Sequence, residues 1–275
     1  MMDTSERIKA LLSRRVLENI TLLKMLEAYG AAMNCRLLEH DEQWSMLLRL
    51  PTSDCPYDAK TYPDASHIVF LAGTDADLLD QLVGELSLNQ PLVFKVQRAE
   101  YEALLRNRLT LERKRAFHTY SIGKGDLVKL PSRDVAEERR LNAALLPLWM
   151  ANGYAREELE VMFVGGARSY TLYEQGSPVS TCLAFPNYGK VWEIGAVHTL
   201  ASHRGRGLAA QVVGAAAASL IERGLVPRYH VEAGNAASIA LAEKLGFTHE
   251  VELVHLHYAG NGEGTPTDSR GASTC

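Results

Sequence analysis

The segment that decides the fold is "HRGRGLAAQVVGAAAASL", residues 203–220, in which two arginines and two glycines precede a run of alanine and valine. The alanine-rich part predicts a helix from Leu208 to Arg223 that is ended by Gly224. A helix start carries backbone N–H groups without intrahelical partners and the positive end of the helix dipole, which suits phosphate groups. The segment is therefore either a phosphate-binding loop or a glycine turn before a surface helix.

The spacing of this loop differs from that of the common nucleotide motifs. The sequence contains neither GxxxxGK[ST] nor GxGxxG, so it supports neither a Walker-type nor a dinucleotide site. Residues 204–209 instead read RGRGLA, an R-x-x-G-x-A pattern. Gly205 and Gly207 would let the backbone approach a pyrophosphate, and Arg204 and Arg206 could add charge-assisted hydrogen bonds.

A second motif follows in "NAASIALAEKLGF", residues 235–247, where an asparagine and a small residue open a helix that ends in K-L-G-F. A strand is predicted between the two motifs at 227–233, and three strands with marked turns are predicted at 169–200. Residues 135–154 are predicted to be mostly helical. Together the two motifs and their order resemble the GNAT superfamily of N-acetyltransferases over roughly residues 118–258.

The resemblance implies an α/β (α+β) GNAT fold, with a mixed, mostly antiparallel central sheet flanked by helices. The layout is similar to two-domain members with a degenerate N-terminal half, such as glycine N-acyltransferase-like proteins. We expect a smaller α/β domain over 1–117, with a strand at 67–73 and a helix capped by Thr74, and a GNAT domain over 118–258. The polar, glycine-rich tail at 259–275 is expected to be disordered.

The resemblance also implies which residues hold an acyl-CoA donor. The backbone of Val197 and Thr199 would hydrogen-bond the pantetheine amides as an added strand would, and backbone N–H groups of the 204–209 loop would bind the pyrophosphate. Asn235 and Ser238 would contact the donor and could also cap their helix. The expected donor-binding residues are Val197, Thr199, Arg204, Gly205, Arg206, Gly207, Leu208, Ala209, Asn235 and Ser238.

A general base would assist catalysis, because an alkyl amine is protonated at neutral pH. Relatives often carry a glutamate on the strand before the loop, which makes Glu193 the first candidate. His198 is the second candidate because of its near-neutral intrinsic pKa. His230 and Glu232 on the next strand are the third. Each of the four could equally be a strand residue that faces solvent or is satisfied by its neighbours.

The sequence departs from the family at the position of the general acid. Many relatives carry a tyrosine four residues before the glycine of K-L-G-F, and Ala242 stands there in this chain. Tyr229 or a water could protonate the leaving thiolate instead. Otherwise the thiolate leaves without assistance, or the activity is lost.

Composition limits the partners and the location. A formal net charge of −4 over 275 residues argues against a general nucleic-acid binder. The four cysteines are scattered and form no CxxC pair, which favours a reducing, cytoplasmic compartment and no zinc or other metal site. No apolar stretch approaches the roughly 20 residues that a membrane span requires.

The leading hypothesis is therefore an N-acetyltransferase that moves an acetyl or other acyl group from acyl-CoA to a primary amine of a small molecule or peptide. The alternative is a non-catalytic acyl-CoA-binding or regulatory module of the same fold. A nucleic-acid-binding protein that uses Arg204 and Arg206 is the least supported hypothesis. The N-terminal domain could shape the acceptor pocket, form the interface of a homodimer, or only stabilise the second domain.

Overall fold

The computed structural model describes residues 4–128 and 134–261. Within it the chain divides into two compact units. Unit 1 comprises Met1–Leu11, Met25–Lys114 and Val254–Cys275, and unit 2 comprises Leu12–Lys24 and Arg115–Leu253. The domain limits expected at residues 117 and 258 stay predictions. The tail expected to be disordered lies outside the described residues from residue 262 onward.

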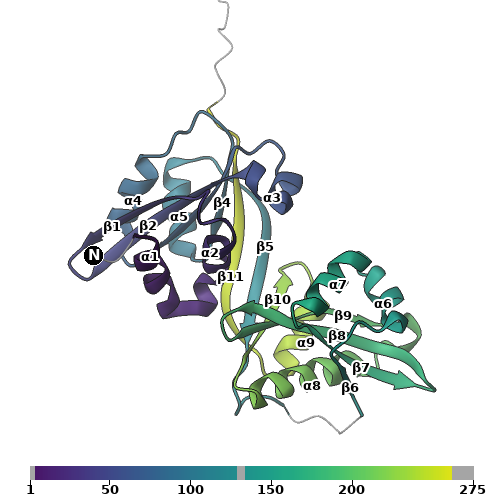
Figure 1. Ribbon diagram of the computed structural model, residues 1–275. Coiled ribbons are helices and arrows are strands. Elements are labelled where there is room, and N and C mark those ends of the chain that lie inside the picture. The colour runs from purple at the N-terminus through teal and green to yellow at the C-terminus, as the bar shows by residue number, and fades with distance from the viewer. Residues whose placement is uncertain (1–3, 129–133, 262–275) are drawn as a thin grey trace, which may run out of the picture. The chain divides into compact units, whose positions relative to one another are not determined.

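Unit 1 contains a sheet of mixed direction (Figure 1). Its strands are β1 (Asn34–His40), β2 (Gln43–Pro51), β3 (His67–Gly73), β4 (Leu92–Val96) and the end of β11 (Thr248–Tyr258). Neighbouring strands are antiparallel except β3 and β4. The apolar run at 67–73 is β3, as predicted, whereas β1 and β2 were not predicted.

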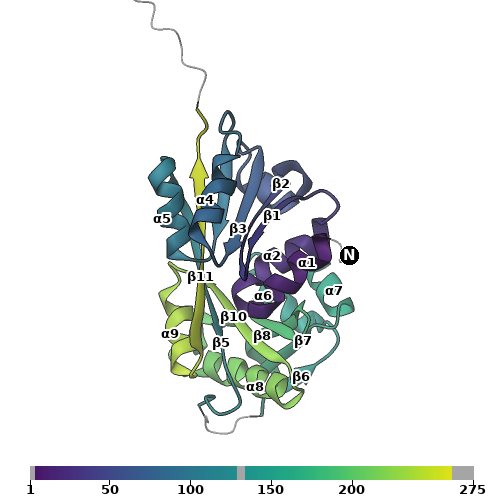
Figure 2. The same ribbon diagram turned by 90° about the vertical axis from the view of Figure 1, so that its left-hand side faces the viewer.

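Helices complete unit 1. They are α1 (Thr4–Leu12), α3 (Pro56–Thr61), α4 (Ala76–Gly84) and α5 (Ala99–Arg108), with the last turn of α2 (Val16–Tyr29), whose residues up to Lys24 belong to unit 2. Figure 2 shows α4 and α5 on one face of the strands. The residue that caps α4 is Asp75, which accepts a hydrogen bond from the Leu78 N–H at 2.9 Å. The expected cap, Thr74, is wrong because its hydroxyl instead accepts from the Trp44 N–H at 3.0 Å.

Unit 2 is built on a sheet in the order β5-β10-β9-β8-β7-β6. The strands are β5 (Glu112–Ser121), β6 (Ala136–Glu138), β7 (Arg168–Glu174), β8 (Ser177–Tyr188), β9 (Val191–Thr199) and β10 (Val226–Glu232). Only β9 and β10 are parallel, so the sheet is mixed and mostly antiparallel, as predicted. The three strands predicted at 169–200 are β7, β8 and β9.

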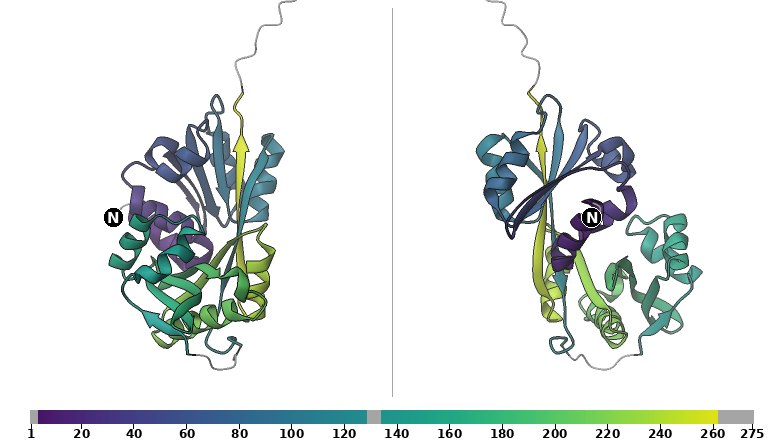
Figure 3. Two further views of the ribbon diagram at one scale, coloured as in Figure 1. Left: turned by 90° about the vertical axis from the view of Figure 1, so that its right-hand side faces the viewer. Right: turned by 60° about the vertical axis from the view of Figure 1, so that its left-hand side comes forward.

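Helices cover both faces of the unit 2 sheet (Figures 1 and 3). On one face lies α8 (Leu208–Glu222), which begins at the residue predicted for it, and α9 (Ala236–Lys244) follows β10. On the other face lie α6 (Leu146–Met150) and α7 (Arg156–Val164). The prediction of a mostly helical segment at 135–154 is wrong, because only residues 143–150 are helical.

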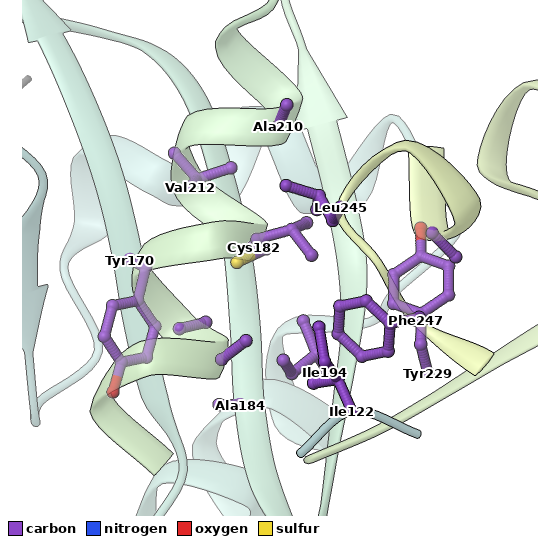
Figure 4. Close-up of a cluster of buried hydrophobic side chains, with 14 of the residues drawn as sticks. Ile122, Tyr170, Cys182, Ala184, Ile194, Ala210, Val212, Tyr229, Leu245 and Phe247 are labelled. Atoms are coloured by element: carbon purple, nitrogen blue, oxygen red, sulfur yellow. The ribbon is translucent and has the colours of Figure 1, made fainter. Parts of the chain in front are cut away.

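Successive residues of β8 serve the two faces, as the alternation of side chains along a strand requires. Cys182 and Ala184 lie in the core beneath α8, together with Val212 and other apolar residues (Figure 4). Leu183, between them, packs with Trp149 in the core on the opposite face. The two cores fix the sheet between the two helical layers.

Strands β9 and β10 pair only along their first halves. The parallel ladder runs from Val191 opposite Val226 to Ile194 opposite Tyr229, and both strands continue beyond it. A bulge follows directly in β9, where Ala196 has a φ of 51° and the register with β8 shifts. The second half of β9 is therefore not paired with β10, and a gap opens at its carboxyl end.

Candidate active site

A pocket of about 540 Å³ opens at this end of β9. It is bounded by the second half of β9, the 203–207 loop, the start of α8 and the exposed side of α9. Every expected donor-binding residue except Arg206 lines it: Val197, Thr199, Arg204, Gly205, Gly207, Leu208, Ala209, Asn235 and Ser238. The fold thus brings two segments about 30 residues apart in the sequence to one pocket, and their donor-binding role stays a prediction.

Two glycines shape the loop that enters α8. Gly205 and Gly207 have φ values of 76° and 75°, a left-handed conformation that favours glycine. A Cβ at either position would meet nothing within 4 Å, so the conformation, and not a lack of space, requires glycine here. Gly207 is also the N-cap of α8 and offers no side chain to cap it. The N–H groups of the first turn of α8 therefore remain available for an anionic ligand.

The two arginines of the loop have different partners. Arg204 lines the pocket, and its Nε donates to the Thr199 carbonyl at 3.2 Å. Arg206 forms an ion pair with Glu174 on β7, with 2.6 Å between Nη2 and Oε1, and it does not line the pocket. Lys244 at the end of α9 also lines the pocket, a position that the sequence motifs did not indicate. Arg204 and Lys244 are its fully charged lining residues, and among the described residues no Asp or Glu lines it.

Asn235 caps α9 as expected. Its Oδ1 accepts a hydrogen bond from the Ser238 N–H at 3.1 Å. Both residues also line the pocket. The capping hydrogen bond is thus present at the edge of the site where the resemblance places the donor.

Glu193, the first candidate base, lies on β9 outside the lining of the pocket. Its carboxylate forms an ion pair with Arg228 on β10 and accepts from Asn187 Nδ2 at 2.7 Å. Arg228 is buried, and its second terminal nitrogen donates to Thr119 at 3.2 Å. The Glu193 carboxylate is thus already engaged as the partner of a buried arginine charge.

His198, the second candidate, lines the pocket. Its Nδ1 lies 2.9 Å from Oδ1 of Asn152, which belongs to the turn after α6 and lines the same pocket. Burial lowers the pKa of His198, and the positive charge of Arg204 lowers it further. Sequence reasoning missed Asn152, since the only local signal is an Asn-Gly pair that marks a turn.

The third candidates, His230 and Glu232, contact residues outside the pocket. His230 Nδ1 lies 2.9 Å from the hydroxyl of Thr119, and its ring stacks on Phe117. Glu232 forms an ion pair with Arg115 at 3.0 Å. Neither His230 nor Glu232 lines the pocket.

Ala242 and Tyr229 both belong to the core beneath α8 (Figure 4 labels Tyr229). Ala242 is fully buried on α9. Burial raises the pKa of the Tyr229 phenol, while a hydrogen bond with Ser238 acts in the opposite direction. The Tyr229 hydroxyl thus adjoins a residue that lines the pocket.

Comparison with known proteins agrees with this architecture. Residues 138–247 match the model of the acetyltransferase (GNAT) family. No curated protein sequence matches the chain. Residues 138–247 are therefore a GNAT acetyltransferase domain, which includes β7 to β10 and both helices of the pocket.

Solved structures of GNAT proteins share the fold at low sequence identity. An acetyltransferase from Colwellia psychrerythraea is 14% identical, with a TM-score of 0.55, over 88% of this chain and 97% of its own. A GCN5-related N-acetyltransferase from Kribbella flavida is 15% identical, with a TM-score of 0.51, over 94% and 97%. Another, from Sphaerobacter thermophilus, is 12% identical, with a TM-score of 0.50, over 88% and 86%. These similarities extend over both units of the chain and concern the fold alone.

Two further findings bear on cofactors and membranes. Within residues 4–128 and 134–261, no group of three or more His, Cys, Asp or Glu side chains is placed to hold a metal ion. No helix in the same ranges is long and apolar enough to cross a bilayer.

Proposed function

We propose that the protein is an acyl-CoA-dependent N-acyltransferase. It would transfer an acetyl or other acyl group to a primary amine of a small molecule or peptide by direct attack in a ternary complex. The observation that carries the proposal is the pocket at the start of α8, whose loop offers backbone N–H groups and whose charged lining residues are Arg204 and Lys244. An anionic donor with phosphate groups fits these features.

The gap beside β9 suits the extended arm of such a donor. The backbone of Val197 and Thr199 is not paired with β10, so it can receive a ligand in the manner of an added strand. Both carbonyls already accept one side-chain hydrogen bond, from Asn152 and Arg204 respectively, and each retains a second lone pair.

The contacts of the two leading base candidates favour His198. Glu193 is engaged by Arg228 and Asn187, whereas His198 faces the pocket with a lowered pKa and is neutral at pH 7. Glu193 would then organise the strands beside the site. With Ala242 in the core, a proton for the leaving thiolate would come through Ser238 from the Tyr229 hydroxyl, or from water.

The second candidate function is a non-catalytic acyl-CoA-binding module, which Ala242 supports. Incubation of the protein with acetyl-CoA and a panel of amines, amino acids and aminoglycosides, followed by measurement of free thiol, separates the two. Thiol release that requires an added amine supports the enzyme. Binding of acetyl-CoA by calorimetry without turnover across the panel would support the module. A cytoplasmic location and a homodimer stay predictions.

A further inference from the structure

We propose that Asn152 is a positioning residue that fixes the ring tautomer of His198, so that His198 Nε2 receives a proton from the acceptor amine. This inference rests on the N-acyltransferase function proposed above. Asn152 lies in the turn that follows α6, His198 lies on β9 just after the bulge, and both line the pocket. No sequence motif of the donor site includes Asn152.

The orientation of the Asn152 amide follows from its first contact. One amide atom lies 3.1 Å from the backbone oxygen of Val197. A carbonyl oxygen can only accept a hydrogen bond, so the atom that faces it must be Nδ2, which donates. The other amide atom, 2.9 Å from Nδ1 of His198, is therefore Oδ1.

The tautomer of His198 follows from the second contact. An amide oxygen can only accept, so Nδ1 of His198 must carry the proton in this hydrogen bond. In the neutral ring Nε2 then holds the free lone pair. Among the residues that the structure describes, Nε2 has no hydrogen-bond partner. The hydrogen bond to Asn152 thus holds the His198 ring and leaves Nε2 free to accept a proton.

The surroundings keep the ring neutral. Burial and the positive charge of Arg204 both lower the pKa of His198. The other titratable side chains that line the pocket are His203, next to Arg204, and Lys244 on α9. Neither of them is a carboxylate, and opposite His198 on β8 stands the uncharged Thr181. No carboxylate among the described lining residues stabilises the imidazolium, so the free base predominates near pH 7.

The proton transfer fits the balance of the reaction. The acceptor ammonium gives one proton to Nε2, which becomes an imidazolium N–H and later loses that proton to solvent. The amine lone pair forms the bond to the acyl carbon, and the electron pair of the C–S bond leaves with sulfur. The second proton of the nitrogen passes to the thiolate by way of water or of the Ser238 and Tyr229 hydroxyls, which give up one proton and take back another, so the products are the amide and the free thiol.

The tautomer can be measured without turnover. In protein labelled with ¹⁵N-histidine, long-range ¹H–¹⁵N spectra distinguish a protonated Nδ1 from a protonated Nε2, and His198→Gln assigns the signal. We expect the Nδ1–H form in the unaltered protein. A signal in the Nε2–H form would overturn the positioning role.

The pH dependence of kcat/KM tests the effect of the Asn152 contact on His198. Asn152→Asp places a carboxylate beside Nδ1 and should raise the pKa of His198 by about one unit, in both the spectrum and the acidic limb of kcat/KM. Asn152→Ala should lower kcat about tenfold through the loss of one ordering hydrogen bond. The matched control is Asn107→Asp on α5, which adds the same charge on a helix that does not line the pocket.

The outcomes separate this inference from the function on which it rests. Equal shifts in Asn152→Asp and Asn107→Asp, or a shift in the spectrum without one in the rate profile, would overturn the assignment of His198 as the base. If the unaltered protein releases no thiol with any amine, the enzyme function fails and the proton transfer with it, whatever the tautomer. Parallel shifts in spectrum and rate profile, confined to Asn152→Asp, support the inference.

Discussion

Glu193 on β9 and Arg228 on β10 stand opposite each other in the parallel ladder and form an ion pair. Only 4% of Arg228 is exposed, so its charge depends on this partner. The pair lies at the last rungs before β9 and β10 separate, next to the gap that leads into the pocket. A charge contact therefore lies next to the last rung of the ladder, which joins Ile194 and Tyr229.

Arg228→Met alone should lower the free energy of unfolding, whereas replacement of both partners of the ion pair should change it little. The single variant leaves a partly buried carboxylate without its guanidinium and should lose about 3 kcal/mol of unfolding free energy. Arg228→Met with Glu193→Leu should regain most of it. Urea unfolding of the two single variants and the double variant measures the coupling, and additive effects would show that the ion pair does not exist in solution.

Gly207→Val should weaken CoA binding at least tenfold while the protein remains folded. The φ of 75° strains any β-branched residue, and relief of that strain would move the N–H groups of the loop. Gly224→Val is the control, since Gly224 has a φ of 68°, equally open surroundings and a place beyond the other end of α8. Calorimetry with CoA compares them; unchanged affinity in Gly207→Val contradicts the phosphate site.

Arg204→Gln and Arg206→Gln should differ in their effect on CoA affinity. Arg204 lines the pocket, so the loss of its positive charge should weaken binding about tenfold at low salt and less at high salt. Arg206 is held by Glu174, so its loss should change binding less than twofold. Equal losses in the two variants would mean that Arg206 leaves Glu174 when the donor binds.

Glu137→Gln should remove a pH-dependent part of the stability. Burial alone would raise the pKa of Glu137, but hydrogen bonds from Arg223 at 2.6 Å and Arg168 at 2.5 Å hold it at about 2. A depressed carboxylate pKa stabilises the folded state above the unfolded pKa near 4.5. That contribution, on the order of 2 kcal/mol, is lost as the pH falls from about 4.5 toward 2.

Thermal unfolding of the unaltered protein and of Glu137→Gln between pH 7 and pH 2.5 checks this expectation. The melting temperatures should differ most above pH 5 and converge in acid. Glu160→Gln serves as the control because Glu160 pairs with Arg156 on the exposed side of α7. A difference in melting temperature that stays constant at every pH would show that the arginines do not lower the pKa of Glu137.

Much of unit 2 was predictable because its elements are decided locally. The turns at 175–176 and 189–190 and the glycine at the end of α8 separate short strands from one long helix, and the predicted strands and helix agree with β7, β8, β9 and α8. The loop glycines were predictable for the same reason, since few residues adopt a positive φ. The strand β5 was not predictable: charged residues fill its first half, and neighbouring strands supply the pairing that makes it a strand.

The sequence by itself determined the resemblance to GNAT proteins and the glycine loop before α8, because R-x-x-G-x-A and the segment ending in K-L-G-F are local patterns of residues adjacent along the chain. Only the tertiary structure decided the partners of the charged groups. It paired Glu193 with Arg228 and Arg206 with Glu174, and it placed Asn152 against His198 across 46 residues of chain. Hydrogen bonds and ion pairs act over a few ångströms, so which side chains form them depends on strand register and packing.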